Sequence, residues 1–90
     1  MAVMEFEWDE GKDAANRAKH GVSLADAVRL DWQSGRDVPD VRFDYGEFRV
    51  TRYALLEGRL HVCVFTMRNN VRRIISLRRA NERERMAYGI

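Results

Sequence analysis

The stretch that decides the fold is RRIISLRRANERERM, residues 72–86. Its first half sets Ile74, Ile75 and Leu77 among arginines, which is typical of a β-strand. Its second half is a charged run whose acidic and basic residues lie three positions apart, a spacing that stabilises a helix. We therefore predict that the chain ends with a strand over 71–78 followed by a helix over 79–88.

Two further strand candidates precede this stretch. Residues 47–56 alternate apolar and polar side chains, and 60–67, LHVCVFTM, is apolar on both faces. A run that is apolar on both faces suits a central strand, covered on each side. The segment EGR at 57–59 and the pair Asn69-Asn70 are typical of hairpin turns.

The first half of the chain predicts a short strand and two helices. In residues 3–9, VMEFEWD, apolar and acidic residues alternate. Asp9 suits a helix N-cap and Gly21 the position after a helix end, with an inner face of small residues at Ala14, Ala15 and Ala18. Ser23 begins a second helix whose capping box is completed by Asp26, and whose apolar positions are Leu24, Ala27, Val28 and Trp32. The segment QSGRDVPD, residues 33–40, is expected to be a loop.

Together these elements predict one α+β domain spanning residues 1–90, in which N-terminal helices and a C-terminal helix pack on a small antiparallel sheet. Cys63 lies in the central strand and is expected to be a buried free thiol, which favours a reducing compartment. No stretch reaches the length of a membrane span, and the acidic start is unlike a signal peptide. We expect a cytoplasmic protein.

The net charge of +2 conceals an asymmetry between the two halves of the chain. Residues 1–45 hold ten acidic and six basic residues, whereas residues 46–90 hold ten arginines and four glutamates. Arginine outnumbers lysine by 14 to 2, and its planar fork suits phosphate and carboxylate groups. A basic half indicates a nucleic acid or an acidic protein as partner.

The last strand suggests where such a partner binds. Strict alternation places Arg72, Ile74, Ser76 and Arg78 on one face and Val71, Arg73, Ile75, Leu77 and Arg79 on the other. Ser76 and Arg78, with Arg68 from the preceding strand, would form a phosphate-binding surface on an open sheet face. The competing interpretation is a solvated sheet edge on which arginines prevent aggregation.

Other candidate groups are few, and none has the spacing of a metal site. His20 titrates near neutral pH and shares a helix end with Lys19, although both also suit capping of that end. Glu47 is an alternative proton acceptor, or a structural carboxylate paired with Arg49. Trp8 and Tyr88 could stack on bases, but packing in the core is the favoured interpretation.

The chain resembles the BrnT toxins, the ribonuclease component of BrnT–BrnA toxin–antitoxin systems. The resemblance rests on four segments in order: FEWDEGKDAANRAKHGVSLADA at 6–27, DYGEFR at 44–49, EGRLHVCVFTMR at 57–68 and RIISLRRANERERMAY at 73–88. It implies a RelE-like fold and a metal-independent endoribonuclease, without cofactor, that arrests translation. It also implies a ribbon-helix-helix antitoxin of the BrnA type, operator DNA contacted only through that antitoxin, and a toxin dimer in the complex.

On this hypothesis the adjacent 2′-OH attacks the phosphate, so the site needs a proton acceptor, cations and a proton donor. Lys19 and His20, or Glu47, would transfer protons. Arg68, Arg73 and Arg78, with Ser76, would hold the phosphate. Because alternation places Arg73 and Arg78 on opposite faces, all three arginines can face one phosphate only with a bulge or at the strand end. Further RNA contacts are assigned to Trp8, Arg49, Arg72, Arg79 and Tyr88. The alternative is a non-catalytic module that binds RNA or protein through the same arginines.

Overall fold

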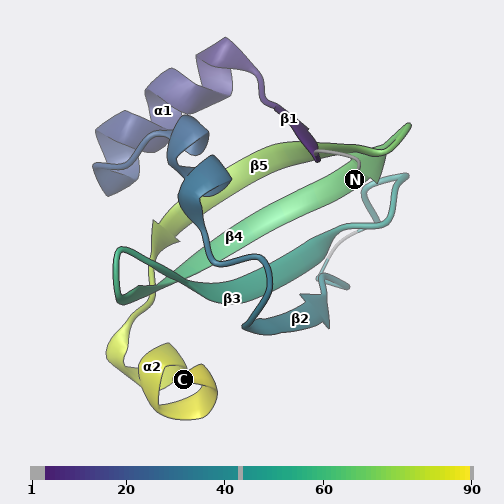
Figure 1. Cartoon of the computed structure of the whole chain (residues 1–90). Helices are drawn as coiled ribbons and strands as arrows, with labels where there is room; N and C mark the ends of the chain where they lie inside the picture. The colour runs from purple at the N-terminus through teal and green to yellow at the C-terminus, as the bar shows by residue number, and fades with distance from the viewer. Residues whose placement is uncertain (1–3, 43, 90) are drawn as a thin grey trace.

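The computed structural model describes residues 4–42 and 44–89, which form a five-stranded sheet with helical elements around it (Figure 1). The strands are β1 (Glu5–Glu7), β2 (Arg36–Pro39), β3 (Val50–Leu56), β4 (Arg59–Arg68) and β5 (Val71–Arg79), arranged in the order β1-β5-β4-β3-β2. The helical elements are α1 (Glu10–His20), the 3-10 helix η1 (Leu24–Arg29) and α2 (Glu82–Tyr88). The predicted α+β class is confirmed. None of the helices in this described part of the chain is long and apolar enough to cross a membrane.

The sheet is mixed, so the prediction of a purely antiparallel sheet was wrong. β1 pairs in parallel with β5, with Glu5 opposite Val71 and Glu7 opposite Arg73, whereas all other neighbours are antiparallel. Parallel neighbours need a long crossover connection. Here everything from α1 to β4 lies between β1 and β5 in the sequence. The predicted first strand began at Val3, which lies outside the described residues.

The predicted loop at 33–40 contains the edge strand β2. Asp37 explains why this polar segment pairs with β3, because its carboxylate accepts hydrogen bonds from Arg52 at 2.6 and 2.8 Å across the two strands. Pro39 is the last residue of β2, and an edge strand tolerates a proline because one side of it needs no hydrogen-bond donors.

The hairpin turns follow the predictions. Glu57 and Gly58 between β3 and β4, and Asn69 and Asn70 between β4 and β5, all have positive φ angles. Two consecutive residues with positive φ make the turn whose twist matches that of the flanking strands.

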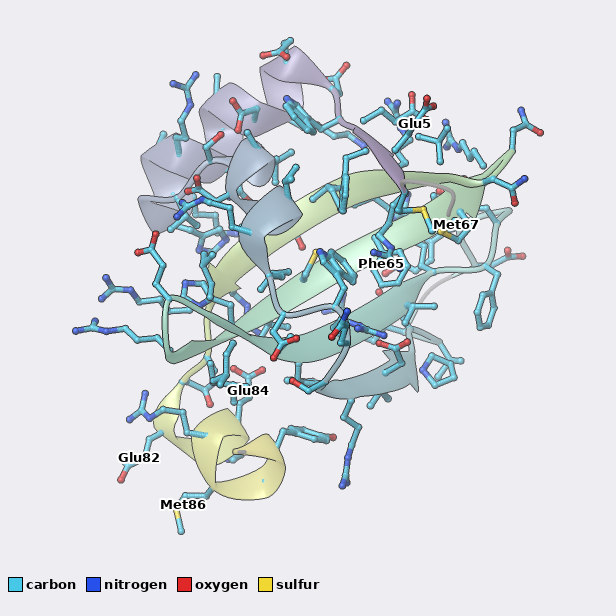
Figure 2. The ribbon with its side chains drawn as sticks, viewed as in Figure 1. Glu5, Phe65, Met67, Glu82, Glu84 and Met86 are labelled. Atoms are coloured by element: carbon cyan, nitrogen blue, oxygen red, sulfur yellow. The ribbon has the colours of Figure 1, made fainter. Side chains whose placement is uncertain are left out.

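The hydrophobic core lies between η1 and one face of the sheet, which we call the inner face. Leu24, Ala27 and Leu30 from η1 and its end pack there against Cys63, Phe65, Ile74 and Leu77 of β4 and β5. Figure 2 shows Phe65 among side chains in front of the sheet, on the side that η1 covers. Cys63 is a fully buried free thiol, as predicted, and burial raises its pKa to about 12.

Helix α1 buries polar rather than small side chains, which corrects the predicted inner face. Ala14, Ala15 and Ala18 are exposed, whereas Asp13 and Asn16 are buried. The side-chain amide of Asn16 donates to the carbonyl of Leu77 at 2.8 Å and accepts from its N–H at 3.2 Å. Because β1 pairs only with the start of β5, Asn16 acts as the hydrogen-bonding partner of the β5 edge beyond it.

A β-bulge in β5 changes which side chains share a face. Val64 lies opposite Ser76 but Phe65 lies opposite Ile74, so Ile75 is the extra residue. Directly opposite residues share a face, and Arg73 lies opposite Thr66, two residues from Val64. The outer face therefore carries Arg73, Ser76 and Arg78, and the inner face carries Arg72, Ile74, Leu77 and Arg79. The strict alternation expected for β5 was wrong at 72–75.

Helix α2 begins at Glu82, three residues later than predicted, because β5 extends to Arg79. Asn81 caps the helix in a capping box with Glu84. α2 packs on the outer face through Tyr88, whose ring stacks on Tyr53 with centroids 3.9 Å apart. Ala87 is exposed.

Candidate active site

An open cleft of about 450 Å³ lies over the outer face of the sheet. Its floor consists of two rows of side chains from three adjacent strands. Thr51, Val64 and Ser76 lie opposite one another in one row, and Tyr53, Val62 and Arg78 in the next. The rim comes from three other places in the sequence: Lys19 and His20 at the end of α1, Asp40 and Arg42 after β2, and Glu84 of α2. The cleft thus brings together four residues predicted to act in catalysis, namely Lys19, His20, Ser76 and Arg78.

Arg78 is held rigidly at the floor of this cleft. Its two terminal nitrogens donate to the two carboxylate oxygens of Glu84, each at 2.8 Å, and one also donates to the Arg79 carbonyl at 3.3 Å. Such a bidentate pair is a strong and geometrically specific interaction. It raises the pKa of Arg78 and lowers the pKa of Glu84. Figure 2 shows Glu84 between α2 and the sheet, whereas Glu82 and Met86 point away from it.

The surroundings of His20 favour its neutral form. Its pKa is lowered, first by partial burial and then by the positive charges of Lys19 and Arg78. A histidine with a lowered pKa is neutral at pH 7, which is the form that acts as a base. The left-handed residue Gly21 (φ 75°) ends α1 at this point and fixes where His20 and Lys19 stand relative to β5.

Arg42 is a cleft cation that the sequence did not single out. It donates two hydrogen bonds to Asp40, at 2.9 and 3.0 Å, and Tyr45 donates a third to the same carboxylate at 3.2 Å. These bonds, led by that from Arg42, lower the pKa of Asp40 to about 2. Arg42 was hard to predict because it lies between the loop predicted at 33–40 and the strand predicted at 47–56, where no element was expected. Only the pairing of β2 with β3 brings it over the outer face.

Three predicted residues form a separate cluster at the far end of β4. Glu47 accepts hydrogen bonds from Arg68 at 2.7 Å and from Arg49 at 3.2 Å. These two arginines, Arg68 first, lower the pKa of Glu47. Glu47 is therefore paired with Arg49, as expected if it is a structural carboxylate rather than a proton acceptor. None of the three residues lines the cleft.

The two arginines that begin the opening stretch point to opposite faces and lie outside the cleft. Arg73 is on the outer face and pairs with Glu7 of β1 at 3.3 Å. Arg72 is on the inner face, with its guanidinium 3.8 Å from the ring centre of Trp32 and close to Phe6 and Phe65. Partial burial there lowers the pKa of Arg72. Arg72 thus packs on aromatic rings of the core, a placement at odds with its assignment as an RNA contact.

The remaining predicted RNA contacts, Trp8, Tyr88 and Arg79, also lie outside the cleft. Trp8 packs against the inner core and donates to Glu10 at 3.1 Å, and Tyr88 stacks on Tyr53, so both have the packing role that was favoured. Arg79 is exposed at the end of β5 and has no carboxylate partner in the described part of the chain.

Sequence reasoning missed Thr51 and Tyr53 in the floor and Asp40, Arg42 and Glu84 at the rim. Register alone brings Thr51 and Tyr53 beside Ser76 and Arg78, and register between three strands is not visible in a single sequence. In residues 4–42 and 44–89 no group of three or more histidine, cysteine, aspartate or glutamate side chains is arranged to hold a metal ion.

The chain matches one known family over most of its length. Residues 8–84 match the family model of the ribonuclease toxin BrnT of type II toxin–antitoxin systems. The chain belongs to the BrnT toxin family. The crystal structure of the ribonuclease toxin BrnT of Brucella abortus is similar, with a TM-score of 0.71 and 25% sequence identity, and the match covers 89% of this chain and 100% of that one. No curated protein matches the chain in sequence.

The family match covers the cleft. The matched range, 8–84, includes every lining residue from Lys19 to Glu84. BrnT proteins are ribonuclease toxins of type II systems, which implies an RNA substrate and an antitoxin partner.

Proposed function

We propose that the chain is an endoribonuclease toxin that cleaves RNA through the neighbouring 2′-OH, without a metal ion, in the outer-face cleft. The observation that carries the proposal is His20, whose pKa is lowered and which lines the same cleft as Lys19 and the rigidly held Arg78. A neutral base and two cations are the groups that this reaction requires.

In the proposed reaction His20 takes the proton from the 2′-OH, and the oxygen attacks the adjacent phosphorus. The phosphorus–O5′ bond breaks, and Lys19 gives a proton to the departing O5′. The products are a 2′,3′-cyclic phosphate and a 5′-OH. Arg78 and Ser76 donate hydrogen bonds to the phosphate oxygens while negative charge builds up on them. General acid–base catalysis of this kind contributes roughly 10²–10⁴-fold.

His20 is preferred to Glu47 as the base for an electrostatic reason. Glu47 is held by two arginines that lower its pKa, which makes it a weaker proton acceptor, and it stands outside the cleft. Arg68 and Arg73 then serve as outer-face contacts for the RNA strand beyond the cleaved phosphate. The bulge supports this assignment because it turns Arg73 to the same face as Arg78.

The biological role follows the family. We propose a single RelE-like domain that acts in the cytoplasm and arrests translation. It would be neutralised by a ribbon-helix-helix antitoxin of the BrnA type, which alone contacts operator DNA, in a complex containing a toxin dimer. Growth arrest on induced expression, relieved by co-expression of the antitoxin, tests this role.

The reaction is tested with purified protein and an RNA oligonucleotide in excess EDTA. Cleavage to 2′,3′-cyclic phosphate ends, abolished in folded His20→Ala and Arg78→Ala variants, is the expected result. Cleavage that requires added metal, or that survives both substitutions, contradicts the mechanism.

The second candidate function is a non-catalytic binding module. The ion pairs of Arg42 and Arg78 favour it to the extent that both cations already have a carboxylate partner. RNA binding without cleavage, and without growth arrest on expression, is the result that this alternative predicts.

A further inference from the structure

The arginines of this chain fall into two groups that the sequence does not separate. In the described residues, eight arginines have a carboxylate within 4 Å: Arg17, Arg29, Arg42, Arg49, Arg52, Arg68, Arg73 and Arg78. The cleft is among the balanced regions, because Asp40 offsets Arg42 and Glu84 offsets Arg78. Lys19 is left as its unbalanced cation. A cleft of this kind can position a phosphate, but it attracts a polyanion only weakly.

Uncompensated positive charge gathers instead at the end of the sheet next to α2. Arg59 follows the β3–β4 turn, Arg79 ends β5, and Arg85 lies on α2. The three line one hollow of about 360 Å³ together with Gly58, Leu60 and Ala80, and no carboxylate lines it. We call this hollow, defined by Arg59, Arg79 and Arg85, the basic hollow.

The basic hollow is partly preorganised. Arg85 donates to the carbonyl of Ala80 at 3.2 Å, which holds its side chain over the hollow, and the Ala80 N–H donates to the carbonyl of Leu60 at 3.0 Å, which joins two of its walls. Arg59 and Arg79 have no carboxylate within 4 Å in the described part of the chain. They also line a neighbouring hollow with Asp26 and Glu57, but both of those carboxylates are bound by Arg29. The guanidinium donors of Arg59 and Arg79 are therefore available. Several planar forks around a concavity suit the oxygens of a phosphate group.

The hollow is also adjacent to the cleft in the chain. Arg78 and Glu84 line the cleft, and their neighbours Arg79 and Arg85 line the hollow. Arg78 lies on the outer face of β5 and Arg79 on its inner face, so the cleft and the hollow meet the end of this strand from opposite sides. An RNA strand held at Arg78 would pass this end of the sheet with its next phosphates.

We propose that the basic hollow binds backbone phosphates of the RNA substrate outside the cleaved linkage, and that it supplies most of the electrostatic affinity that the cleft lacks. This inference rests on the proposed ribonuclease function. It names the substrate as an extended RNA strand, because a single dinucleotide in the cleft would not reach the hollow.

Binding to a 2′-O-methyl RNA oligonucleotide of about 12 nucleotides tests the proposal, since such RNA cannot be cleaved through a 2′-OH. For single strands each phosphate contact contributes about 0.7 to the salt dependence of log K. The variant Arg59→Ala/Arg79→Ala/Arg85→Ala is therefore expected to lower that slope by about 2. Between about 50 and 200 mM salt the wild-type affinity should fall roughly 20-fold more than that of the variant.

Two controls separate charge from folding. The triple lysine variant keeps the charges and should retain the wild-type slope, whereas Arg36→Ala, an exposed arginine on the edge strand β2, should leave it unchanged. Thermal unfolding of each variant confirms that it is folded, and Arg59→Ala/Arg79→Ala, which spares α2, should lower the slope by about 1.4.

An unchanged slope in the folded double and triple variants overturns the proposal, as does an equal loss in Arg36→Ala. If the triple variant instead loses binding to a poly-glutamate peptide while RNA binding is intact, the hollow serves an acidic protein and the proposal is wrong. Cleavage by the wild-type chain is measured separately with unmodified RNA. Absence of cleavage alongside a hollow-dependent slope would refute the reaction and retain the binding site.

Discussion

The ion pair between Arg78 and Glu84 allows a prediction in which binding and catalysis change in opposite directions. In Glu84→Gln the carboxylate charge is lost, but glutamine can still complete a capping box with Asn81. Arg78 would keep at most one of its two hydrogen bonds to this side chain. The variant therefore alters the restraint and the charge balance of Arg78 while leaving the start of α2 intact.

The expected magnitudes follow from the geometry. Removal of the glutamate charge relieves its repulsion of a bound phosphate across the guanidinium. At a separation of about 7 Å this is worth roughly 1 kcal/mol for an effective dielectric constant of about 50, between those of a protein surface and bulk water. RNA should bind about 5-fold more tightly. A looser Arg78 should lower kcat by roughly 10-fold, because misplacement of a positioning group by about 1 Å costs up to 10²-fold.

The matched control is Glu82→Gln on the same helix. Glu82 is exposed and has no ion-pair or hydrogen-bond partner among the described residues, so the same change of charge should leave both constants within about 2-fold. The loss of a half-buried charged pair should lower the stability of Glu84→Gln by about 1 kcal/mol, a shift in Tm of roughly 4–8 °C.

Steady-state cleavage of a fluorescent RNA oligonucleotide gives kcat and KM, and anisotropy with 2′-O-methyl RNA gives Kd independently. The acidic limb of the pH–rate profile should also move to lower pH in Glu84→Gln, because Arg78 would act on His20 without its counter-charge. The charged groups around His20 that enter this argument are Lys19, Arg78, Asp40, Arg42 and Glu84. A Glu84→Gln variant with unchanged kcat, or with weaker RNA binding, would refute the assignment of Glu84 as the residue that positions Arg78.

Three further predictions concern single groups. Because the pKa of His20 is lowered, the rate of single-turnover cleavage should rise with pH through a midpoint below the usual value for histidine and then level off. Lys19→Ala removes a positive charge beside His20 and should move that midpoint upward. A wild-type midpoint above 6.5 would contradict the role of His20. Asn16→Ala should lower the free energy of unfolding, measured in urea, by roughly 2–4 kcal/mol, because the N–H and the carbonyl of Leu77 both lose their partner. The control Ala18→Ser, on the exposed side of α1, should change it by less than about 0.5 kcal/mol. Cys63, buried with its pKa raised to about 12, should react with a thiol reagent only at the rate of unfolding, and fast reaction in native buffer would show that β4 opens locally.

The bulge in β5 shows what a single sequence can and cannot give. Ile74 and Leu77 are both almost fully buried, yet they are separated by three positions, an odd number that strict alternation places on opposite faces. The odd spacing of apolar residues in RRIISLR was therefore a visible sign of an extra residue. The sequence does not fix which of Ser76, Ile75 and Ile74 is extra, because that depends on the partner positions Val64 and Phe65 in β4.

Local signals were reliable where local physics decides the structure. The caps at Asp9, Gly21, Ser23 and Asn81, and the turn at Asn69-Asn70, all reflect hydrogen bonds or φ angles within a few residues. Of these, the cap at Asn81 was missed because the helix was expected to begin earlier. The long-range arrangements were the ones that failed, such as the parallel pairing of β1 and the edge strand β2. They depend on which distant segment offers free backbone groups, and propensity does not encode this.

The candidate site shows the same contrast between local signals and long-range contacts. His20 and Arg78 could be proposed from residue chemistry alone, and they do line one cleft, although 58 positions in the chain separate them. Their partners at the rim, Asp40, Arg42 and Glu84, could not be proposed, because strand register and the docking of α2 create those contacts.

The charge asymmetry between the two halves of the sequence does not survive as one acidic and one basic surface in the folded chain. Acidic residues of the first half neutralise arginines of the second across the sheet, as Glu7 does for Arg73 and Asp37 for Arg52. Six arginines in the opening stretch therefore do not make one basic surface. Arg72 stacks on aromatic rings, and Arg73 and Arg78 have carboxylate partners. Arg83 is exposed on α2, whereas Arg79 and Arg85 meet Arg59 at a hollow that no carboxylate lines. If RNA follows the unpaired charge, its path runs past the end of β5 rather than along the whole strand, and the salt dependence of the basic-hollow variants decides between the two paths.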